Sequence, residues 1–398
     1  MSTPPASGPA VAAAAPSAAE PDLLYDATAE ELRSSVRTLL ASRSDWQAVL
    51  ARMESDAPVD TDLWRRLADI GVAGLAVPEE LDGSGATWRE VAVVAEEIGR
   101  ATAPVPFLGS TVLATAALLA VAGTGDASDA AGALLRRLAA GEVATVAVPL
   151  STAPGGAFPA GVTVTGGRAS GTVTSVADAR AAAVLLVPVF EDGAPALYAV
   201  PAAATTRTPV VSLDLTRPLD DVALSDVATG APQDANGAQL LARGAAAVEA
   251  VNGALVAGAC ILASEQLGVA ERCLELTTAY VRERHQFGRP IGSYQALKHR
   301  LADLWVSVTQ ARAVARYAAA CLADSSPDLP VAAALAQAHL SELAVHAAEE
   351  CVQLHGGIGF TWEHPAHLLL KRAMADALSF GTATQSRAAL GRLVGLPA

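Results

Sequence analysis

The chain is poor in cysteine, aromatic residues and lysine. Of its 398 residues, 4 are cysteines, 4% are aromatic and only two are lysines. The cysteines are far apart and match neither a Cys-x-x-Cys pair nor a zinc-site spacing, which argues against a disulfide framework and a zinc module. We expect them to be reduced and mostly packed inside the protein. They are Cys260, Cys273, Cys321 and Cys351.

Basic residues are also outnumbered, and the formal net charge is −14 at pH 7. Nucleic-acid binding depends on clustered Lys and Arg side chains that release counterions from the phosphate backbone. The charge therefore argues against nucleic acid as a partner. The 7 histidines contain no pair at the i,i+4 spacing of a helical zinc motif, so we expect no metal site.

The sequence favours neither a signal peptide nor a membrane span. Residues 1–25 are rich in Ala, Pro and Ser and lack a basic start, so we expect a disordered tail and a cytoplasmic protein. Residues 101–125 carry no charge and are long enough to cross a bilayer. However, prolines and glycines interrupt this stretch, which favours a buried helix around Thr111 to Ala122 over a membrane span.

The character of the sequence changes twice along the chain, which predicts three domains. Apolar residues recur at three- and four-residue spacing over 26–143, as an α-helical domain requires. Short Val- and Thr-rich runs follow over 144–238 and predict a compact β domain. Helical spacing returns over 239–398, which predicts a second helical domain. The long helices expected there cover 245–282, 295–323 and 330–354.

Two irregular motifs in the last third of the chain are the most informative part of the sequence. The first is Glu-Arg-His-Gln-Phe-Gly-Arg-Pro-Ile-Gly-Ser-Tyr-Gln over 283–295, and the second is Gln-Leu-His-Gly-Gly-Ile-Gly-Phe over 353–360. In order and position they resemble the flavin-binding signatures of the acyl-CoA dehydrogenases. The succession of helices, β domain and helices also resembles that family. It implies an α+β fold, the acyl-CoA dehydrogenase fold, with an N-terminal helical domain, a middle β domain and a C-terminal four-helix bundle.

The resemblance assigns the first motif to cofactor binding across a subunit interface. In the family, the equivalents of Arg284, Gln286 and Phe287 reach the FAD of the neighbouring subunit, with the arginine near the pyrophosphate. A planar guanidinium suits this role because it can hold two phosphate oxygens at once. The alternative is that Arg284 is a solvated surface residue and Phe287 a core residue.

The second motif resembles the other half of the FAD site that a subunit of the family provides to its neighbour. Gln353, Gly356 and Gly357 take the matching positions, and glycines let a backbone approach a bulky cofactor without a Cβ clash. Two glycines at a helix end also form an ordinary C-cap, so both interpretations can hold. Thr382 and Thr384 match family positions beside the FAD on the chain's own side, although short polar residues at a helix start are also common caps.

The chain departs from the family at the catalytic base. Family members carry Tyr-Glu-Gly-Thr near the C-terminus, with Glu as the base, whereas this chain reads Ser-Phe-Gly-Thr over 379–382. A phenyl ring accepts no proton, so Phe380 cannot act as the base. Some members carry the Glu on the preceding long helix, and the matching position is about Gly258. We therefore expect no catalytic residue at either position.

The β domain also departs from the family. The stretch that contacts the flavin ring and the acyl-CoA in the family corresponds here to residues 148–156, which read Val-Pro-Leu-Ser-Thr-Ala-Pro-Gly-Gly. The flavin-ring half of the site is therefore eroded, whereas the half donated to a neighbour is complete. This asymmetry suggests a subunit that completes the FAD site of a different, catalytically complete acyl-CoA dehydrogenase subunit.

The resemblance implies an FAD-dependent enzyme that desaturates an acyl-CoA between its α and β carbons and passes electrons to an electron-transfer flavoprotein. The asymmetry of the site favours a heterotetramer with another acyl-CoA dehydrogenase subunit over a homo-oligomer. One alternative is a self-sufficient homo-oligomer with an unrecognised base such as Glu249 or Glu265, and another is a flavin-free structural pseudoenzyme. Residues 362–367, Trp-Glu-His-Pro-Ala-His, resemble a pattern in actinobacterial members that act on steroid side chains, which favours a bulky thioester.

Overall fold

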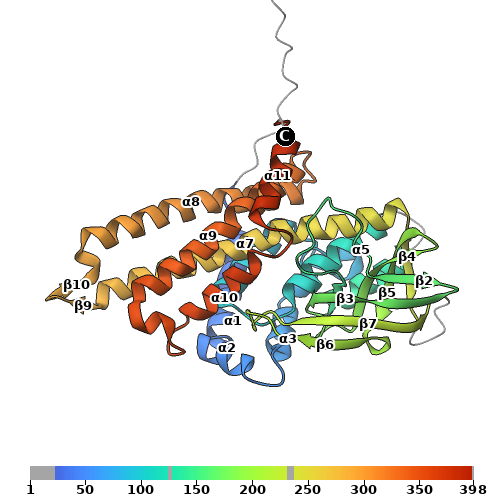
Figure 1. Cartoon of the computed structure of the whole chain (residues 1–398), viewed down its shortest axis with the longest axis horizontal. Coiled ribbons are helices and arrows are strands. Elements are labelled where there is room, and N and C mark those ends of the chain that lie inside the picture. Colours follow the sequence, from blue (N-terminus) through green and yellow to red (C-terminus); the bar gives the residue numbers. More distant parts are fainter. Residues whose placement is uncertain (1–22, 124–127, 231–236, 397–398) are drawn as a thin grey trace, which may run out of the picture.

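The computed structural model describes residues 23–123, 128–230 and 237–396. The N-terminal region is helical (Figure 1). The side chains of Asp26, Asp45 and Asp60 cap the first three helices by accepting backbone hydrogen bonds, which fixes where these helices begin. The helices of this region are α1 (Ala27–Arg43), α2 (Trp46–Met53), α3 (Thr61–Asp69), η1 (Val72–Gly74), η2 (Glu79–Leu81), α4 (Trp88–Ala101), the π-helical η3 (Leu108–Ala114), α5 (Thr115–Ala122) and α6 (Ser128–Ala139).

The uncharged stretch 101–125 contains the buried helix that the sequence predicts. All residues of η3 are buried, and α5 continues it with one buried side. Among the described helices, only α7 (Ala245–Glu283) is long and apolar enough to cross a membrane by length and composition. Most of its apolar window is buried inside the protein, as is usual for the core helix of a folded domain.

The segment before α1 is held against three helices. We expected a disordered tail over 1–25, of which residues 1–22 lie outside the described residues. Tyr25 corrects this expectation, because its hydroxyl donates to Glu96 Oε1 at 2.7 Å. Its ring also lies 4.9 Å from the guanidinium carbon of Arg33 and 3.9 Å from that of Arg316. A buried carboxylate and two cations therefore fix the last residue of the expected tail.

The middle region is a mixed sheet in the strand order β6-β7-β3-β2-β4-β5-β8, with β1 beside β4. Strands β1 and β2 run parallel to β4, and the other pairs are antiparallel. Because β8 pairs with β5, the sheet extends past the predicted domain boundary at residue 238. The strands are β1 (Ala144–Val146), β2 (Val162–Thr165), β3 (Arg168–Ala177), β4 (Val184–Glu191), β5 (Ala194–Pro201), β6 (Thr206–Val210), β7 (Leu219–Ala228) and β8 (Gln239–Arg243), with the short helix η4 (Ala202–Ala204) after β5.

The C-terminal region is a helical bundle, as the sequence predicts. In Figure 1, α8 and α9 lie beside α7, and α11 projects from the top of the molecule. The first three helices match the predicted ranges to within one residue at each end. The helices are α7 (Ala245–Glu283), α8 (Gln295–Ala323), α9 (Leu329–His355), α10 (Ala366–Asp376) and α11 (Ala383–Leu393), with short turns η5 (Ile291–Ser293) and η6 (Gly356–Phe360).

Helix α7 joins the two halves of the protein. Its first half packs in one core with the N-terminal helices and the sheet, and its second half packs in another with α8 and α9. A Cβ added at Gly99 would lie 2.1 Å from the carbonyl oxygen of Glu265, and one added at Gly268 would lie 1.9 Å from that of Glu96. These two glycines therefore let α4 lie directly against α7.

Candidate functional site

The first motif forms a hairpin that projects from the end of α7. Strands β9 (His285–Gln286) and β10 (Arg289–Pro290) pair antiparallel, and the turn residues Phe287 and Gly288 both have positive φ, at 53° and 78°. Positive φ at both positions suits a tight hairpin turn, but it is uncommon for a bulky residue such as Phe. The Phe287 side chain is 92% exposed. The alternative that Phe287 is a core residue is therefore wrong for this chain.

Arg284 stands at the base of the hairpin and Gln286 directly before its turn, and both are exposed. The backbone of Arg284 is fixed, since its N–H donates to the Tyr280 carbonyl and its own carbonyl accepts from Ile291. Its guanidinium makes no hydrogen bond or ion pair with any residue in the described part of the chain. An arginine with a fixed backbone and a free fork is ready to bind an anion from outside the chain.

The second motif lies at the same end of the bundle (Figure 1). The rings of Tyr280 on α7 and His355 on α9 lie 4.4 Å apart, which brings the ends of the two helices together. Gln353, Gly356 and Gly357 are exposed there, and a Cβ added at either glycine would meet no described atom within 4 Å. Gly356 has a φ of 62°, and its N–H donates to the Gln353 carbonyl as a C-cap. The cap and the open space beside the glycines thus coexist.

Thr382 and Thr384 lie elsewhere. Thr382 caps α11, since its hydroxyl accepts from the Gln385 N–H while the Gln385 side chain accepts from the Thr382 N–H. Both threonines are exposed at the start of α11, far from the β9–β10 hairpin in Figure 1. The structure therefore places the six residues of the two motifs at the same end of the bundle and the two threonines in another part of the molecule.

The two family base positions meet at one point. Phe380 is 1% exposed, its backbone N–H donates to the Leu150 carbonyl at 2.8 Å, and its φ is 54°. A Cβ added at Gly258 would lie 2.5 Å from Cζ of Phe380. The Phe380 ring thus fills the volume next to Gly258, and neither position offers a proton acceptor.

A cavity of about 630 Å³ lies beside the Phe380 ring. Loop 153–156, the first half of α7, the first turns of α9 and part of α11 line it. No Asp or Glu is among the described residues that line the cavity. Gln385 and Ser386 line it, whereas Thr382 and Thr384 do not. The described lining of the cavity therefore contains no carboxylate that could act as a base.

Two amides that the sequence analysis did not single out shape this cavity. Asn252 Oδ1 accepts from the Gly155 N–H at 2.7 Å, which holds loop 153–156 against α7. Gln337 Nε2 donates to the Ser379 carbonyl at 2.6 Å and so fixes the backbone just before Phe380. Gln337 is a single polar residue in an alanine-rich stretch of α9, and this isolated polar position was the feature of the sequence that could have identified it.

Neither alternative base reaches the cavity. Glu249 is exposed on α7 and does not line it. Glu265 is buried and accepts from Arg217 Nη2 at 2.6 Å and from Arg372 Nη1 at 2.9 Å. Arg217 also bonds to Asp376, so Glu265 belongs to a buried ionic network between the sheet domain, α7 and α10.

The cysteines and histidines form no ligand set. All four cysteines are buried and free, as the sequence predicts. In the folded chain Cys273 and Cys351 are neighbours across α7 and α9, and Cys351 Sγ lies 3.7 Å from His355 Nδ1. Among the described residues, no group of three or more His, Cys, Asp and Glu side chains is arranged to hold a metal ion.

Two family models match the chain. The acyl-CoA dehydrogenase N-terminal domain matches residues 26–142, and the acyl-CoA dehydrogenase C-terminal domain matches residues 248–394. Acyl-CoA dehydrogenase IpdE2 of Mycobacterium tuberculosis is 38% identical over 349 residues, which cover 87% of this chain and 91% of that protein. IpdE2 of Mycolicibacterium smegmatis is 37% identical over 354 residues, which cover 88% of this chain and 94% of that protein.

Solved structures show the same fold. One chain of the ChsE4-ChsE5 complex from Mycobacterium tuberculosis has a TM-score of 0.81 and 28% identity, and the match covers 95% of this chain and 100% of that chain. One chain of the Tcur3481-Tcur3483 steroid ACAD has a TM-score of 0.78 and 29% identity, with 92% of this chain and 98% of that chain covered. By both matched domains, the curated relatives and the fold, this chain belongs to the acyl-CoA dehydrogenase family.

Proposed function

We propose that this chain is a base-deficient subunit of a heteromeric FAD-dependent acyl-CoA dehydrogenase. The observation that carries the proposal is the pairing of Phe380 with Gly258, which fills both family base positions with one apolar ring. The motif residues at the opposite end of the bundle, by contrast, are exposed and free to meet a neighbour. A subunit built in this way supports the site of a neighbour better than a site of its own.

The exposed end of the bundle fits a flavin cofactor held jointly with another subunit. Arg284 supplies a free fork for a pyrophosphate, and Phe287 supplies an uncovered apolar ring. Gln286 and Gln353 supply amides that donate and accept hydrogen bonds, and the open space at Gly356 lets a large group approach the backbone. When bound, FAD supplies the acceptor for the hydride that leaves the β carbon of the acyl-CoA.

The removal of the α proton must then fall to the partner. A proton acceptor needs a tuned pKa and hydrogen-bond reach to the substrate, and the wall of the Phe380 cavity has no carboxylate with either property. We therefore assign the base and the flavin-ring contacts to a second, catalytically complete acyl-CoA dehydrogenase subunit. Thr382 and Thr384 remain candidates for contacts to a cofactor on the chain's own side.

The similar structures support a heteromer and a bulky substrate. One is the ChsE4-ChsE5 complex, and the other is the Tcur3481-Tcur3483 steroid ACAD, whose name joins two proteins. We propose a bulky, steroid-type acyl-CoA thioester as substrate, an electron-transfer flavoprotein as electron acceptor and a cytoplasmic location. The assembly we propose is a heterotetramer.

The test is to purify the chain alone and together with the acyl-CoA dehydrogenase encoded beside it, and to record the flavin spectrum of each. We expect flavin only in the mixture, at about one per two chains, because each site needs both kinds of subunit. Flavin at about one per chain in the protein alone would overturn the proposal and support a self-sufficient homomer.

The two alternatives make different predictions. A homomer with an unrecognised base requires a carboxylate at the cavity, but Glu265 is bonded to two arginines and Glu249 does not line the cavity. If Glu249 were nevertheless the base, Glu249→Gln would abolish flavin bleaching by substrate. A flavin-free pseudoenzyme predicts that the mixture with the partner is colourless as well.

A further inference from the structure

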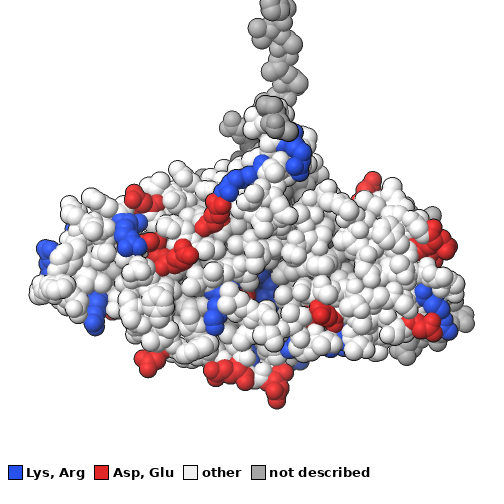
Figure 2. Space-filling model, viewed as in Figure 1, with Lys and Arg blue, Asp and Glu red and all other residues white. Residues whose placement is uncertain are grey.

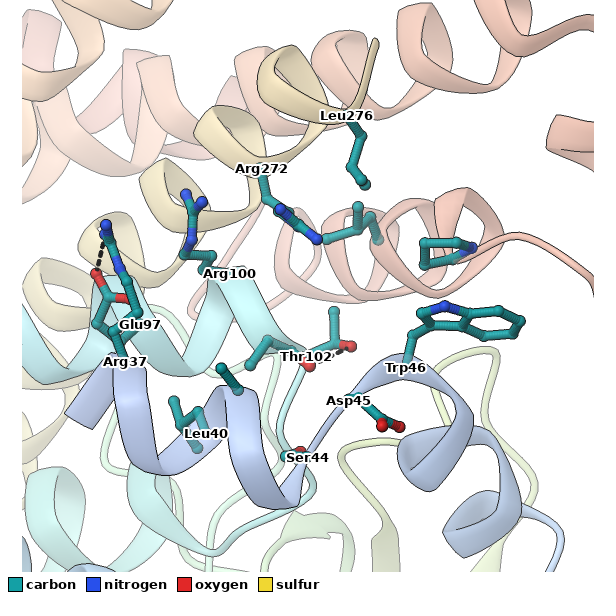
Figure 3. A pocket seen from close by; sticks show the side chains of 14 residues that line it. Arg37, Leu40, Ser44, Asp45, Trp46, Glu97, Arg100, Thr102, Arg272 and Leu276 are labelled. Atoms are coloured by element: carbon teal, nitrogen blue, oxygen red, sulfur yellow. Dashed lines mark hydrogen bonds and ion pairs between the residues drawn. The ribbon is translucent and has the colours of Figure 1, made fainter. Parts of the chain in front are cut away.

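A second cavity lies where the corner between α1 and α2 meets α4, α7 and α10 (Figure 3). Its volume is about 350 Å³, which is within the range of small-molecule sites. No residue of the flavin motifs or of the Phe380 cavity lines it. The function proposed above therefore leaves this cavity unexplained.

Three arginines line the cavity, and two of them are neutralised. Arg37 donates to both carboxylate oxygens of Glu97, at 2.8 and 2.7 Å. Arg100 bonds to both carboxylate oxygens of Glu275. Arg272 is different, because its contact with Glu275 Oε2 is 3.6 Å long and that oxygen is already bonded to Arg100. One guanidinium of the cavity thus lacks a close anionic partner among the described residues.

The side chain of Arg272 points into the interior of the cavity. Figure 3 shows its side chain extending from α7 into the middle of the cavity, while Arg37 and Glu97 face each other at one side. Burial lowers the pKa of Arg272 and the neighbouring Arg100 lowers it further. A guanidinium nevertheless stays charged in proteins, so Arg272 presents a partly desolvated cation.

The remaining wall is largely apolar. Trp46 from α2, Leu276 from α7, Pro365 just before α10 and Leu369 on α10 form the apolar part of the lining. Of the two carboxylates that line the cavity, Glu97 is bonded to Arg37 as described. The other is Asp45, which caps α2 by accepting from the Ala48 N–H at 2.8 Å. Arg272 is therefore the guanidinium of the cavity with the longest ion pair, and it lies beside an apolar surface.

We propose that this cavity binds a small organic carboxylate, with its oxygens on Arg272 and its apolar body against Trp46, Leu276 and Leu369. A guanidinium fork matches a carboxylate in geometry, and the apolar wall removes a compact hydrocarbon group from water. A free phosphate fits less well, because a single spare guanidinium and an apolar wall leave most of its oxygens without donors. Occupation would join α2 to α7 and α10 and so stabilise the folded chain.

The test compares two molecules of the same shape on the full chain. Calorimetric titration with 3-phenylpropanoate is expected to show one saturable site, and the uncharged 3-phenylpropanamide is expected to bind at least about tenfold more weakly. Inorganic phosphate is the third probe. Equal affinity for acid and amide, tighter binding of phosphate, or no binding of the acid to the folded chain would each overturn the proposal.

Variants then locate the site. Arg272→Gln is expected to weaken 3-phenylpropanoate binding at least about tenfold, because it removes a charge-assisted contact. Arg168→Gln is the matched control, since Arg168 also has a weak ion pair, 3.5 Å from Asp226, but lies on the sheet. Trp46→Ala is a second variant and is expected to weaken binding without changing the preference for acid over amide. Wild-type affinity in folded Arg272→Gln or in folded Trp46→Ala would contradict the assignment.

Discussion

A Cβ added at Gly258 on α7 would lie 2.5 Å from Cζ and 2.8 Å from Cε1 of Phe380. The two residues are therefore complementary in shape. Because Gly258 has no side chain, the Phe380 ring can fill the space next to it. Leu113 closes the same volume, since its Cδ2 would lie 2.8 Å from that added Cβ. The two positions at which family members carry a base, 258 and 380, thus share one volume in this protein. The Phe380 ring occupies that volume.

This complementarity predicts a strong coupling between the two positions. Gly258→Ala is expected to lower the free energy of unfolding by about 1–3 kcal/mol, because the new methyl group clashes with a fully buried ring. In a Phe380→Ala background the ring is gone, so the same substitution is expected to cost less, with a coupling energy of at least about 0.5 kcal/mol. Urea unfolding of the wild type, both single variants and the double variant measures this cycle.

Gly253→Ala is the control for the helix itself. Gly253 lies on the same helix, and a Cβ there would meet nothing within 4 Å. Its replacement by Ala is expected to stabilise the protein by about 0.5–1 kcal/mol through helix propensity alone. A Gly258→Ala variant that behaves like Gly253→Ala would show that the Phe380 ring does not fill this space.

Local patterns predicted a large part of this structure. The three long helices follow from apolar periodicity, and the two motifs were correctly expected beside helix ends. Glu265 shows what local patterns miss. It was considered as an alternative base, but it binds Arg217 and Arg372, which lie 48 and 107 positions away in the sequence. Contacts over such separations depend on how α4, α7, α10 and the sheet pack, and no spacing rule contains that information.

The same limit applies to other features. Tyr25 was assigned to a disordered tail because the residues before it are rich in Ala, Pro and Ser, yet it contacts residues on α1, α4 and α8. Strand β8 was missed because it leads almost directly into α7 and is recognised only by its pairing with β5. The cavity around Arg272 combines residues from several helices and has no local signature.

The exposed flavin motif predicts that a variant at Arg284 folds normally but binds flavin weakly in the complex with the partner subunit. Arg284→Gln removes a guanidinium that has no partner in the described chain, so the free energy of unfolding is expected to change by less than about 0.5 kcal/mol. In the complex with the partner subunit, flavin affinity is expected to fall about tenfold or more, since a charge-assisted contact is lost. Flavin released on dilution, followed by absorbance, measures the second effect.

Arg282→Gln is the matched control for this variant. Arg282 is also exposed, two positions before Arg284 in the last turn of α7. It is expected to retain flavin as the wild type does. If both variants lose flavin equally, the effect is a general loss of positive charge and not a contact of Arg284. If neither loses it, Arg284 does not bind the cofactor.

The burial of the cysteines predicts that they are unreactive in the folded protein. Cys260, Cys273, Cys321 and Cys351 are at most 3% exposed. A thiol reagent such as 5,5′-dithiobis(2-nitrobenzoate) is therefore expected to react with none of them in the native chain, and with all 4 after unfolding. Ser42→Cys, at an exposed position on α1, serves as a reactive control. Rapid reaction of any native cysteine would show that the bundle opens locally.

The buried ionic network gives the protein an unusual response to pH. Burial raises the pKa of Asp376 from 3.8 to about 7 and that of Asp178 from 3.8 to about 6, in spite of the neighbouring Arg217. The folded chain therefore keeps protons that the unfolded chain releases above about pH 4. This contribution to stability is present below the unfolded pKa and is lost as pH rises through the folded pKa.

Asp376→Asn is expected to reduce this pH dependence, because the amide does not titrate. The wild type is expected to lose more unfolding free energy than the variant between about pH 4 and pH 7. Urea midpoints measured at several pH values in that range give the two slopes, and Asp303→Asn, at an exposed position on α8, is expected to keep the wild-type slope. An Asp376→Asn slope equal to that of the wild type would mean that Asp376 is ionised throughout the range, with its charge compensated by Arg217.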